Sequence, residues 1–139
     1  MELTEKYTEL YHILGKSIED FEISMKANLT KYTEQEIDWI KNAQIQKFEF
    51  CIELLWKTAK VYLESLEEKL YTPKLTIKSL FVQQIIDEPT YLQLMNCLND
   101  RNLLSHIYKF EMFDEIHKEL GNHLIALKHT YTLLGKLKL

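Results

Sequence analysis

The sequence predicts an all-α fold, an antiparallel, up-and-down four-helix bundle with an additional short helix. Apolar residues recur at spacings of three and four over long stretches, which places them on one face of an α-helix. Only three glycines and two prolines occur in 139 residues, and this leaves little turn chemistry for an all-β fold. Short polar connections separate the helical stretches, as they do between antiparallel neighbours in a bundle. We therefore expect residues 1–139 to form a single helical-bundle domain.

The first helix is expected over residues 4–26 and the second over residues 34–70. One face of the first is apolar throughout (Leu3, Tyr7, Leu10, Leu14, Ile18, Phe21 and Met25). The second opens with Thr33 and, three residues later, Glu36, the pattern of a capping box in which each side chain bonds the backbone of the other residue. Its apolar surface is wider than a two-position seam, so we expect it to be the central helix and to contact more than one neighbour.

A short third helix is expected over residues 77–86. Pro73 is expected to end the second helix, because proline cannot continue one, and Thr76 is expected to cap the third. A polar break then restarts the chain, and Pro89 suits a first helical position. The fourth helix is expected over residues 92–105.

The last helix is expected over residues 113–135. Its apolar residues again recur at spacings of three and four (Phe113, Ile116, Leu120, Leu124, Leu127, Tyr131 and Leu134). Gly121 lies inside this helix and costs about 1 kcal/mol relative to alanine, which leaves room for a bend there.

The composition excludes several classes of protein. With 46% hydrophobic and 27% charged residues, the chain resembles neither a disordered nor a membrane protein. Its N-terminus lacks a charged-then-apolar signal pattern, so we expect a cytoplasmic protein without a membrane partner. The net charge of −4 argues against broad binding of nucleic acid, and DNA binding is not expected. Cys51 and Cys97 lie within apolar helical patterns and are interpreted as small core residues in a reducing compartment.

No metal ion and no cofactor are expected. The histidines of the C-terminal third form no His-x-x-x-His or Glu-x-x-His motif directed at a core (His106, His117, His123 and His129). Glu115, Glu119 and His123 follow one another at spacings of four, which on so charged a helix predicts a solvated face. The sequence contains no glycine-rich phosphate loop, so dinucleotide binding lacks support.

The most distinctive side chains lie in residues 100–108. Arg101 is the single arginine among seventeen basic residues, and it offers a rigid, permanently charged fork for phosphate or carboxylate. His106 follows five residues later, about 140° around a helix axis. The two side chains therefore meet only if the arginine reaches round, the helix loosens, or a second copy of the chain supplies the missing group. Asn102, four residues before His106, is placed to hydrogen-bond its ring and fix the tautomer.

Arginine and histidine together suit one reaction. An imidazole titrates near neutrality and moves protons, while a guanidinium holds a phosphate and stabilises the charge that it gains. Such a pair cleaves RNA without a metal ion when the 2′-hydroxyl of the substrate acts as the nucleophile. Spacing alone favours a plainer interpretation, in which the pair only satisfies polar groups of the fold.

Two stretches carry a resemblance to a known family. Residues 101–108, RNLLSHIY, resemble the Arg-x4-6-His motif of HEPN domains in the form Arg-x4-His-x-Tyr, with a polar residue after the arginine. Residues 47–58, KFEFCIELLWKT, look like the second-helix signature of the HEPN branch named nucleotidyltransferase substrate-binding protein. The similarity covers nearly the whole chain, from its first helix to its last.

The resemblance implies a HEPN-like homodimer whose two Arg-His pairs face each other across a cleft. It implies a metal-independent ribonuclease toxin with RNA as substrate. A minimal nucleotidyltransferase would be the antitoxin partner and would silence the toxin by AMPylation, the transfer of AMP to a tyrosine. By this resemblance Arg101 stabilises phosphate, His106 acts in acid/base catalysis, Tyr108 accepts AMP, and Asn102 and Ser105 orient the site.

Two alternatives stay open. In the first, the chain is a non-catalytic subunit that presents substrate to a nucleotidyltransferase, with Arg101 on a nucleotide phosphate. The branch name and the acidic net charge favour this alternative. In the second, the chain is a structural interaction module, and a partner covers the surplus apolar surface of the second helix.

Overall fold

The computed structural model of the chain describes residues 2–69, 72–106 and 110–139, with side chains throughout except at positions 110 and 111. All regular structure in these residues is helical, which confirms the predicted fold class. The helices are α1 (Leu3–Met25), the short 3-10 turn η1 (Leu29–Lys31), α2 (Glu34–Ser65), α3 (Pro73–Val82), α4 (Glu88–Ser105) and α5 (Phe110–Leu134). No helix in this part of the chain has the length and apolar character that crossing a membrane requires.

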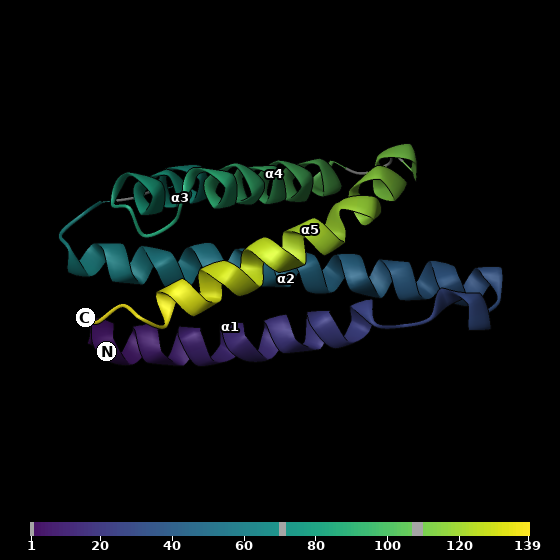
Figure 1. Ribbon diagram of the computed structural model, residues 1–139, viewed down its shortest axis with the longest axis horizontal. Coiled ribbons are helices and arrows are strands. Elements are labelled where there is room, and N and C mark those ends of the chain that lie inside the picture. Colours follow the sequence, from purple (N-terminus) through teal and green to yellow (C-terminus); the bar gives the residue numbers. More distant parts are fainter. Residues whose placement is uncertain (1, 70–71, 107–109) are drawn as a thin grey trace.

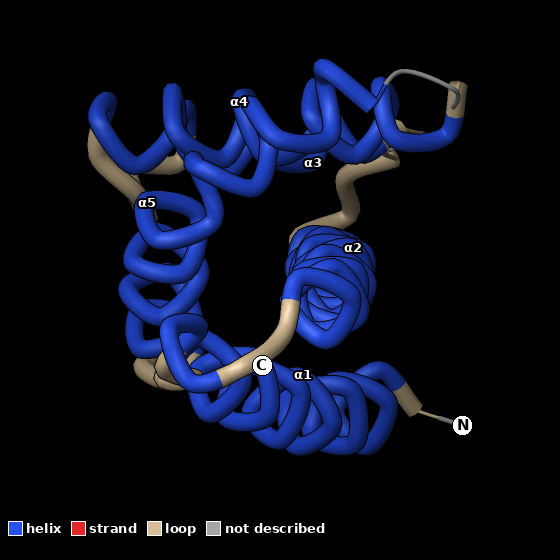
Figure 2. Tube along the Cα trace, turned by 90° about the vertical axis from the view of Figure 1, so that its right-hand side faces the viewer, coloured by secondary structure: helices blue, strands red, loops and turns tan. Residues whose placement is uncertain are grey.

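The helix α2 lies at the centre of the bundle, as its broad apolar surface predicts. The helix α1 runs back along it as an antiparallel hairpin, and α3 and α4 cover its other side (Figure 1). Seen end-on, α5 crosses from the α4 side to the α1 side and closes the bundle (Figure 2). The helix α2 contacts α1, α3, α4 and α5, so the expectation of several neighbours is confirmed.

Short polar motifs set the starts of α2 and α4. Thr33 Oγ1 accepts a hydrogen bond from the Glu36 N–H at 3.2 Å, and Glu36 accepts one from the Thr33 N–H at 3.0 Å, which confirms the predicted capping box. Asp87 caps α4 by accepting from the Thr90 N–H at 3.0 Å. The hydrogen bonds from Thr33 and Thr90 lower the pKa of the Glu36 and Asp87 carboxyl groups, because they favour the charged forms.

The end of α2 differs from the prediction. The helix stops at Ser65 instead of continuing to position 70. Glu67 adopts a left-handed conformation with φ of 64°, and the Glu68 N–H bonds the Leu63 carbonyl at 3.2 Å. This arrangement satisfies a carbonyl of the last helical turn and turns the chain away from the helix axis.

The start of α3 also differs, because Pro73 begins this helix. The helix covers Pro73–Val82 and not residues 77–86. The hydroxyl of Thr72 caps it by accepting a backbone N–H at 3.1 Å, and Pro73 occupies the first turn, where no N–H is needed. Thr76, the predicted cap, is buried inside the helix and donates its hydroxyl to the Thr72 carbonyl at 2.9 Å.

The last two helices start earlier than predicted. The helix α4 begins at Glu88, four residues before the predicted start at position 92, and ends at Ser105 as predicted. The helix α5 begins at Phe110 and continues through Gly121 to Leu134 without interruption.

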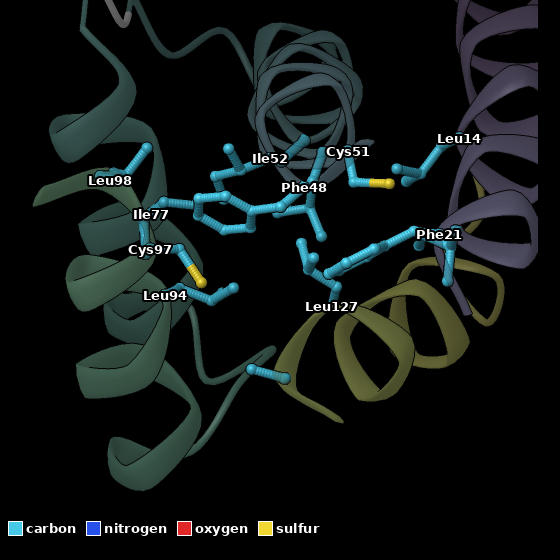
Figure 3. Packing of buried hydrophobic residues seen from close by; sticks show 14 of the residues in the cluster. Leu14, Phe21, Phe48, Cys51, Ile52, Ile77, Leu94, Cys97, Leu98 and Leu127 are labelled. Carbon is cyan, nitrogen blue, oxygen red and sulfur yellow. The ribbon is translucent and has the colours of Figure 1, made fainter. Parts of the chain in front are cut away.

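The apolar core draws on all five α-helices. Phe48 of α2 points into it, among side chains from α1, α3, α4 and α5 (Figure 3). Its ring lies 6.4 Å from that of Phe21 in a tilted arrangement. Cys51 and Cys97 are free and fully buried, which confirms their interpretation as small core residues. Burial raises the pKa of Cys51 to about 12 and raises that of Cys97 as well, so both thiols stay protonated at neutral pH.

Tyrosines join α1 to α5 at the end of the bundle where both termini lie (Figure 1). Tyr7 Oη donates to a carbonyl at the end of α5 at 2.7 Å, and Tyr11 Oη donates to the Tyr131 carbonyl at 3.1 Å. The rings of Tyr11 and Tyr131 stack 4.4 Å apart. A Cβ atom at Gly15 would collide with Tyr131 Oη, and one at Gly135 would collide with Tyr11 Oη. Each glycine therefore leaves room for a tyrosine of the opposite segment, and these five residues are hereafter the tyrosine end.

Candidate functional site

The predicted site residues lie on the last turns of α4. The preceding turns bury three apolar side chains against the core (Leu94, Cys97 and Leu98). Arg101 follows Leu98 by three residues on the same helical stripe, so it reaches the edge of the core where α4 passes α2. The helix ends at Ser105, and the His106 N–H bonds the Leu103 carbonyl at 3.1 Å.

Arg101 is paired with a carboxylate of the central helix. Its Nη2 atom lies 2.8 Å from Oε2 of Glu53, with 33% of the Arg101 side chain and 26% of the Glu53 side chain exposed. Glu49 lies one turn earlier on α2. Burial raises the pKa of Glu49, and the charge of Arg101 partly opposes that rise. The carboxyl groups of Glu53 and Glu49, both on α2, therefore interact electrostatically with the Arg101 guanidinium of the same chain.

Glu53 is held by two further nitrogen groups of α2. Trp56 donates its indole N–H to Oε2 of Glu53 at 3.2 Å. The Nζ atom of Lys57 lies 3.4 Å from Oε1. Arg101, Glu53, Trp56 and Lys57 are hereafter the Arg101 cluster. The sequence did not predict that these three residues of α2 belong to a site, although their spacing of three and four residues is the signal that brings them together on one face of a helix.

The structure does not bring Arg101 and His106 together within one chain. Arg101 turns toward α2, whereas His106 is exposed at the C-terminal end of α4. Across residues 2–69, 72–106 and 110–139, no hydrogen bond or ion pair joins the two side chains. Their separation agrees with the angle that a spacing of five residues predicts.

The two supporting residues lie on the last turn of α4. Asn102 is exposed, and among the described residues it makes no hydrogen bond to His106. Ser105 is exposed and donates its hydroxyl to the Arg101 carbonyl at 3.3 Å, so it bonds the backbone of α4. Tyr108, the predicted AMP acceptor, lies outside the described residues. The roles of all three stay predictions.

His123 is fully buried, so the prediction that it lines a solvated face is wrong. Its Nε2 atom donates to Asp100 Oδ2 at 2.6 Å, and its Nδ1 atom accepts from the Gln93 amide at 2.9 Å. The ring also stacks on Phe48, with 4.9 Å between the ring centres. Both ring nitrogens are satisfied away from solvent, so His123 anchors α5 to the turn of α4 that precedes Arg101.

The sequence contained a signal for this burial. His123 lies three residues after Leu120 and four before Leu127, and both of these leucines are fully buried. Gln93 and Asp100 are seven residues apart and so share one face of α4. A histidine among apolar residues on one face of a helix can be buried when the neighbouring helix supplies hydrogen-bond partners. Which helix faces meet depends on the tertiary fold.

A second histidine connects three helices. His117 Nε2 donates to Gln44 Oε1 at 2.6 Å, and the Gln44 amide donates to the Ser24 carbonyl at 2.8 Å. Burial lowers the pKa of His117, Lys41 lowers it further, and Asp114 opposes both. The imidazole is therefore a neutral link between α5, α2 and α1 at pH 7.

No group of three or more His, Cys, Asp or Glu side chains is arranged to hold a metal ion in the part of the chain that the structure describes. The buried imidazole of His123 and the half-buried imidazole of His117 are already engaged by Asp100 and Gln44. His123 and His117 therefore serve as hydrogen-bonded links between helices.

Part of the apolar surface of α2 stays exposed. Trp39 and Phe50 keep 60% and 58% of their surface in solvent. A groove of about 510 Å³ lies between α1 and α2. It is lined by the apolar side chains of Ile13, Ala43 and Phe50 and by polar and charged ones, which include the ion pair of Lys47 and Asp20. The exposure of Trp39 and Phe50 agrees with the expectation that the second helix has more apolar surface than the bundle covers.

Comparisons with known proteins agree with this fold. The family model described as nucleotidyltransferase substrate binding protein like matches residues 9–136. A protein of Thermus thermophilus, known from its crystal structure, is 20% identical and superimposes with a TM-score of 0.74, over 87% of this chain and 98% of that chain. At this identity the likeness shows a shared fold. No curated protein sequence is similar enough to match.

Proposed function

Because the chain belongs to the nucleotidyltransferase substrate binding protein-like family, we propose that it is a non-catalytic subunit that presents a nucleotide to a nucleotidyltransferase. The family match favours this alternative over the ribonuclease that the Arg-His motif predicts. Arg101 holds the nucleotide phosphate in this proposal, and the transferase supplies the catalytic groups.

The proposal rests on the contacts that Arg101 makes within one chain. Its guanidinium is engaged by Glu53 at 2.8 Å and lies apart from His106. A catalytic pair needs both groups on one phosphodiester, whereas a binding site needs only the arginine. The site that one chain builds is therefore suited to holding a phosphate, and among the described residues no hydrogen bond or ion pair brings the His106 imidazole to it.

The groove between α1 and α2, with the exposed Phe50 ring at it, supports the expectation of a partner. It lies on the hairpin face that carries Phe50, away from the packed core. Exposed apolar surface of this kind marks interaction sites. Phe50 and Glu53 are three residues apart on α2, so a nucleotidyltransferase bound at the groove would lie beside the Arg101 cluster.

The test is to express the tagged chain with a nucleotidyltransferase encoded beside its gene and to measure labelled ATP retained by the purified complex. We expect the transferase to co-purify and Arg101→Gln to lower ATP retention about tenfold without breaking the complex. Lys128→Gln removes a different ion-paired cation, the partner of Glu22, and should leave retention unchanged. ATP retention by the transferase alone that equals retention by the complex would exclude the proposal.

A ribonuclease remains a second candidate because His106 is exposed at the end of α4. Two copies of the chain could then place the His106 of one copy beside the Arg101 of the other, with RNA between them. Induction of the chain alone should degrade cellular RNA, and His106→Ala should abolish the degradation while His129→Ala, another exposed histidine, preserves it. An intact RNA pool after induction of the wild type would remove this candidate.

The same candidate includes modification of Tyr108. The phenolic oxygen would form a bond to the α-phosphorus of ATP, pyrophosphate would leave as the bond to the β-phosphate breaks, and the phenolic proton would pass to solvent. The added phosphate would repel RNA. Intact mass measurement after coexpression with the transferase should show one added AMP group, which Tyr108→Phe should remove.

A homodimer belongs to the ribonuclease candidate as well. Each cleft needs an arginine and a histidine that one chain keeps apart. Analytical ultracentrifugation should therefore give a dimer for an active ribonuclease. A monomer that still cleaves RNA would contradict the proposed division of the site between two copies.

A further inference from the structure

The Arg101 cluster contains an anion-binding site that the chain fills with its own side chain. Three nitrogen groups from two helices converge on one carboxylate: the Arg101 guanidinium at 2.8 Å, the Trp56 indole N–H at 3.2 Å and the Lys57 ammonium at 3.4 Å. Guanidinium and ammonium groups are the usual ligands of phosphate in proteins, and an indole N–H is a donor only. The same three groups would hold a phosphate if the Glu53 carboxylate left.

We propose that Glu53 is an internal, displaceable occupant of a nucleotide-phosphate site formed by Arg101, Trp56 and Lys57. The proposal rests on the proposed function for its ligand class and adds the residues that form the site and the group that controls access to it. A phosphate enters as Glu53 turns toward solvent, so the apparent affinity reflects competition between the two anions.

The exposure of the cluster permits this exchange. About a third of Arg101 and a quarter of Glu53 are in solvent, so a ligand reaches the guanidinium from outside. The Lys57 side chain is half exposed, so its ammonium group stays beside the site and open to a ligand when Glu53 turns toward solvent. An ion pair in contact with water is held weakly and is opened at little cost.

The charges in the cluster explain why an occupant is needed. With Glu53 in place, the two cations of the cluster (Arg101 and Lys57) are matched by Glu53 and by Glu49, which lies one turn earlier on α2 and is within the electrostatic influence of Arg101. Without Glu53, the Trp56 indole N–H and the Arg101 and Lys57 cations would lose the carboxylate that accepts from them or pairs with them. A phosphate dianion replaces the single charge of Glu53 with two, so the site should prefer phosphate to a monocarboxylate.

The anchor behind the cluster fixes the position of the arginine. Asp100, the residue before Arg101, is bonded to the buried ring of His123. The backbone of this turn of α4 therefore stays in place when Glu53 moves. Exchange of the anion requires rotation of the Glu53 side chain alone.

Tryptophan fluorescence offers a direct test, because the chain has two tryptophans and only Trp56 belongs to the cluster. A Trp39→Phe background leaves Trp56 as the single reporter. Titration with inorganic phosphate and with AMP should change its emission to saturation. Glu53→Gln should lower the apparent Kd for both about tenfold, because it removes the competing charge, and Arg101→Gln should abolish saturation.

Two controls separate this effect from a general change of charge. Glu22→Gln removes a carboxylate that pairs with Lys128 elsewhere on the surface, and it should leave the Kd of the parent unchanged. Adenosine, which lacks the phosphate, should give no saturable change. A Kd for Glu53→Gln equal to or higher than that of the parent would overturn the proposal, as would saturable binding by Arg101→Gln.

A measurement on the protein without substitutions covers the case in which a variant does not fold. In a nitrogen-proton NMR spectrum the Trp56 indole signal should shift on addition of phosphate, because its acceptor changes from a carboxylate to a phosphate oxygen. The Trp39 signal should not move. An unmoved Trp56 signal at saturating phosphate refutes the inference while the transferase complex stands. A shifted signal without a transferase complex refutes the proposed function instead.

Discussion

The tyrosine end and the Arg101 cluster connect helices of the same bundle by opposite means. At the tyrosine end, neutral hydroxyls donate to main-chain carbonyls, two rings stack, and glycines leave the room that the rings need. At the Arg101 cluster, charges pair while a quarter to a third of the paired side chains stays in water. Partly exposed ion pairs contribute about 0–1 kcal/mol to stability, whereas close packing in the interior contributes more. The comparison indicates that one region holds the fold and the other is free to exchange partners.

The largest effect is expected from the buried anchor behind the cluster. His123→Ala should lower the free energy of unfolding by about 3 kcal/mol, because it opens a cavity beside Phe48 and leaves Asp100 and Gln93 without their partner. Urea denaturation measures this loss. His129→Ala, on the exposed side of the same helix, should leave the midpoint unchanged. A loss below about 1 kcal/mol for His123→Ala would show that the ion pair, and not the anchor, holds α4 in place.

A methyl group at the tyrosine end should have the next largest effect. Gly15→Ala places a Cβ atom against Tyr131 Oη and should lower stability by about 2 kcal/mol, because the ring has to leave its stack with Tyr11. Combination with Tyr131→Phe should restore part of the loss, since the hydroxyl is the atom nearest to the added carbon. Thermal unfolding followed by circular dichroism measures both changes.

The matched control, Gly121→Ala, should change stability in the opposite direction. Gly121 lies on the exposed side of α5, with no atom near an added Cβ. Gly121→Ala should therefore raise stability by about 1 kcal/mol through helix propensity alone. Equal losses at the two glycines would mean that the tyrosine end has no special packing requirement.

The sequence predicted those features that depend on neighbouring residues. The capping box of Thr33 and Glu36 involves four consecutive positions, and the predicted end of α4 at Ser105 also agrees with the structure. Pro73 was assigned wrongly because proline both ends one helix and suits the first turn of the next, and the choice depends on the Thr72 cap.

The candidate site could be predicted only in part, for a different reason. Arg101 was singled out by its chemistry, and its separation from His106 followed from helix geometry. Its partner Glu53 is 48 positions away on another helix, and nothing in the local pattern of α4 identifies it. His123 was missed because its burial depends on which face of α5 meets Gln93 and Asp100.

Alkaline pH should destabilise the tyrosine end. Burial, followed by the neighbouring Tyr131, raises the pKa of Tyr11 from about 10 to about 12, so the folded protein keeps a proton that the unfolded chain loses. Burial raises the pKa of Tyr7 as well. The contribution of these hydroxyls is complete below pH 10 and is lost as the pH rises from 10 through 12, because the unfolded state binds fewer protons there.

Denaturation at a series of alkaline pH values checks this expectation, with tyrosinate absorbance as a second readout. A Tyr7→Phe and Tyr11→Phe double variant should be less stable at neutral pH but should lose less further stability between pH 10 and 12. An alkaline loss of the same size in the double variant would assign it to other groups.

The smallest effect on stability is expected where the effect on binding is largest. Glu53→Gln keeps the shape of the side chain and an oxygen that accepts from Trp56, and it removes one charge from a partly exposed pair. Its free energy of unfolding should differ from that of the wild type by less than about 1 kcal/mol. If the loss instead exceeds about 2 kcal/mol, Glu53 is part of the framework in the way that His123 is, and a ligand could not displace it without loosening α4 from α2. A near-neutral result in urea together with tighter phosphate binding would mean that the pair contributes little to stability and mainly limits access to Arg101.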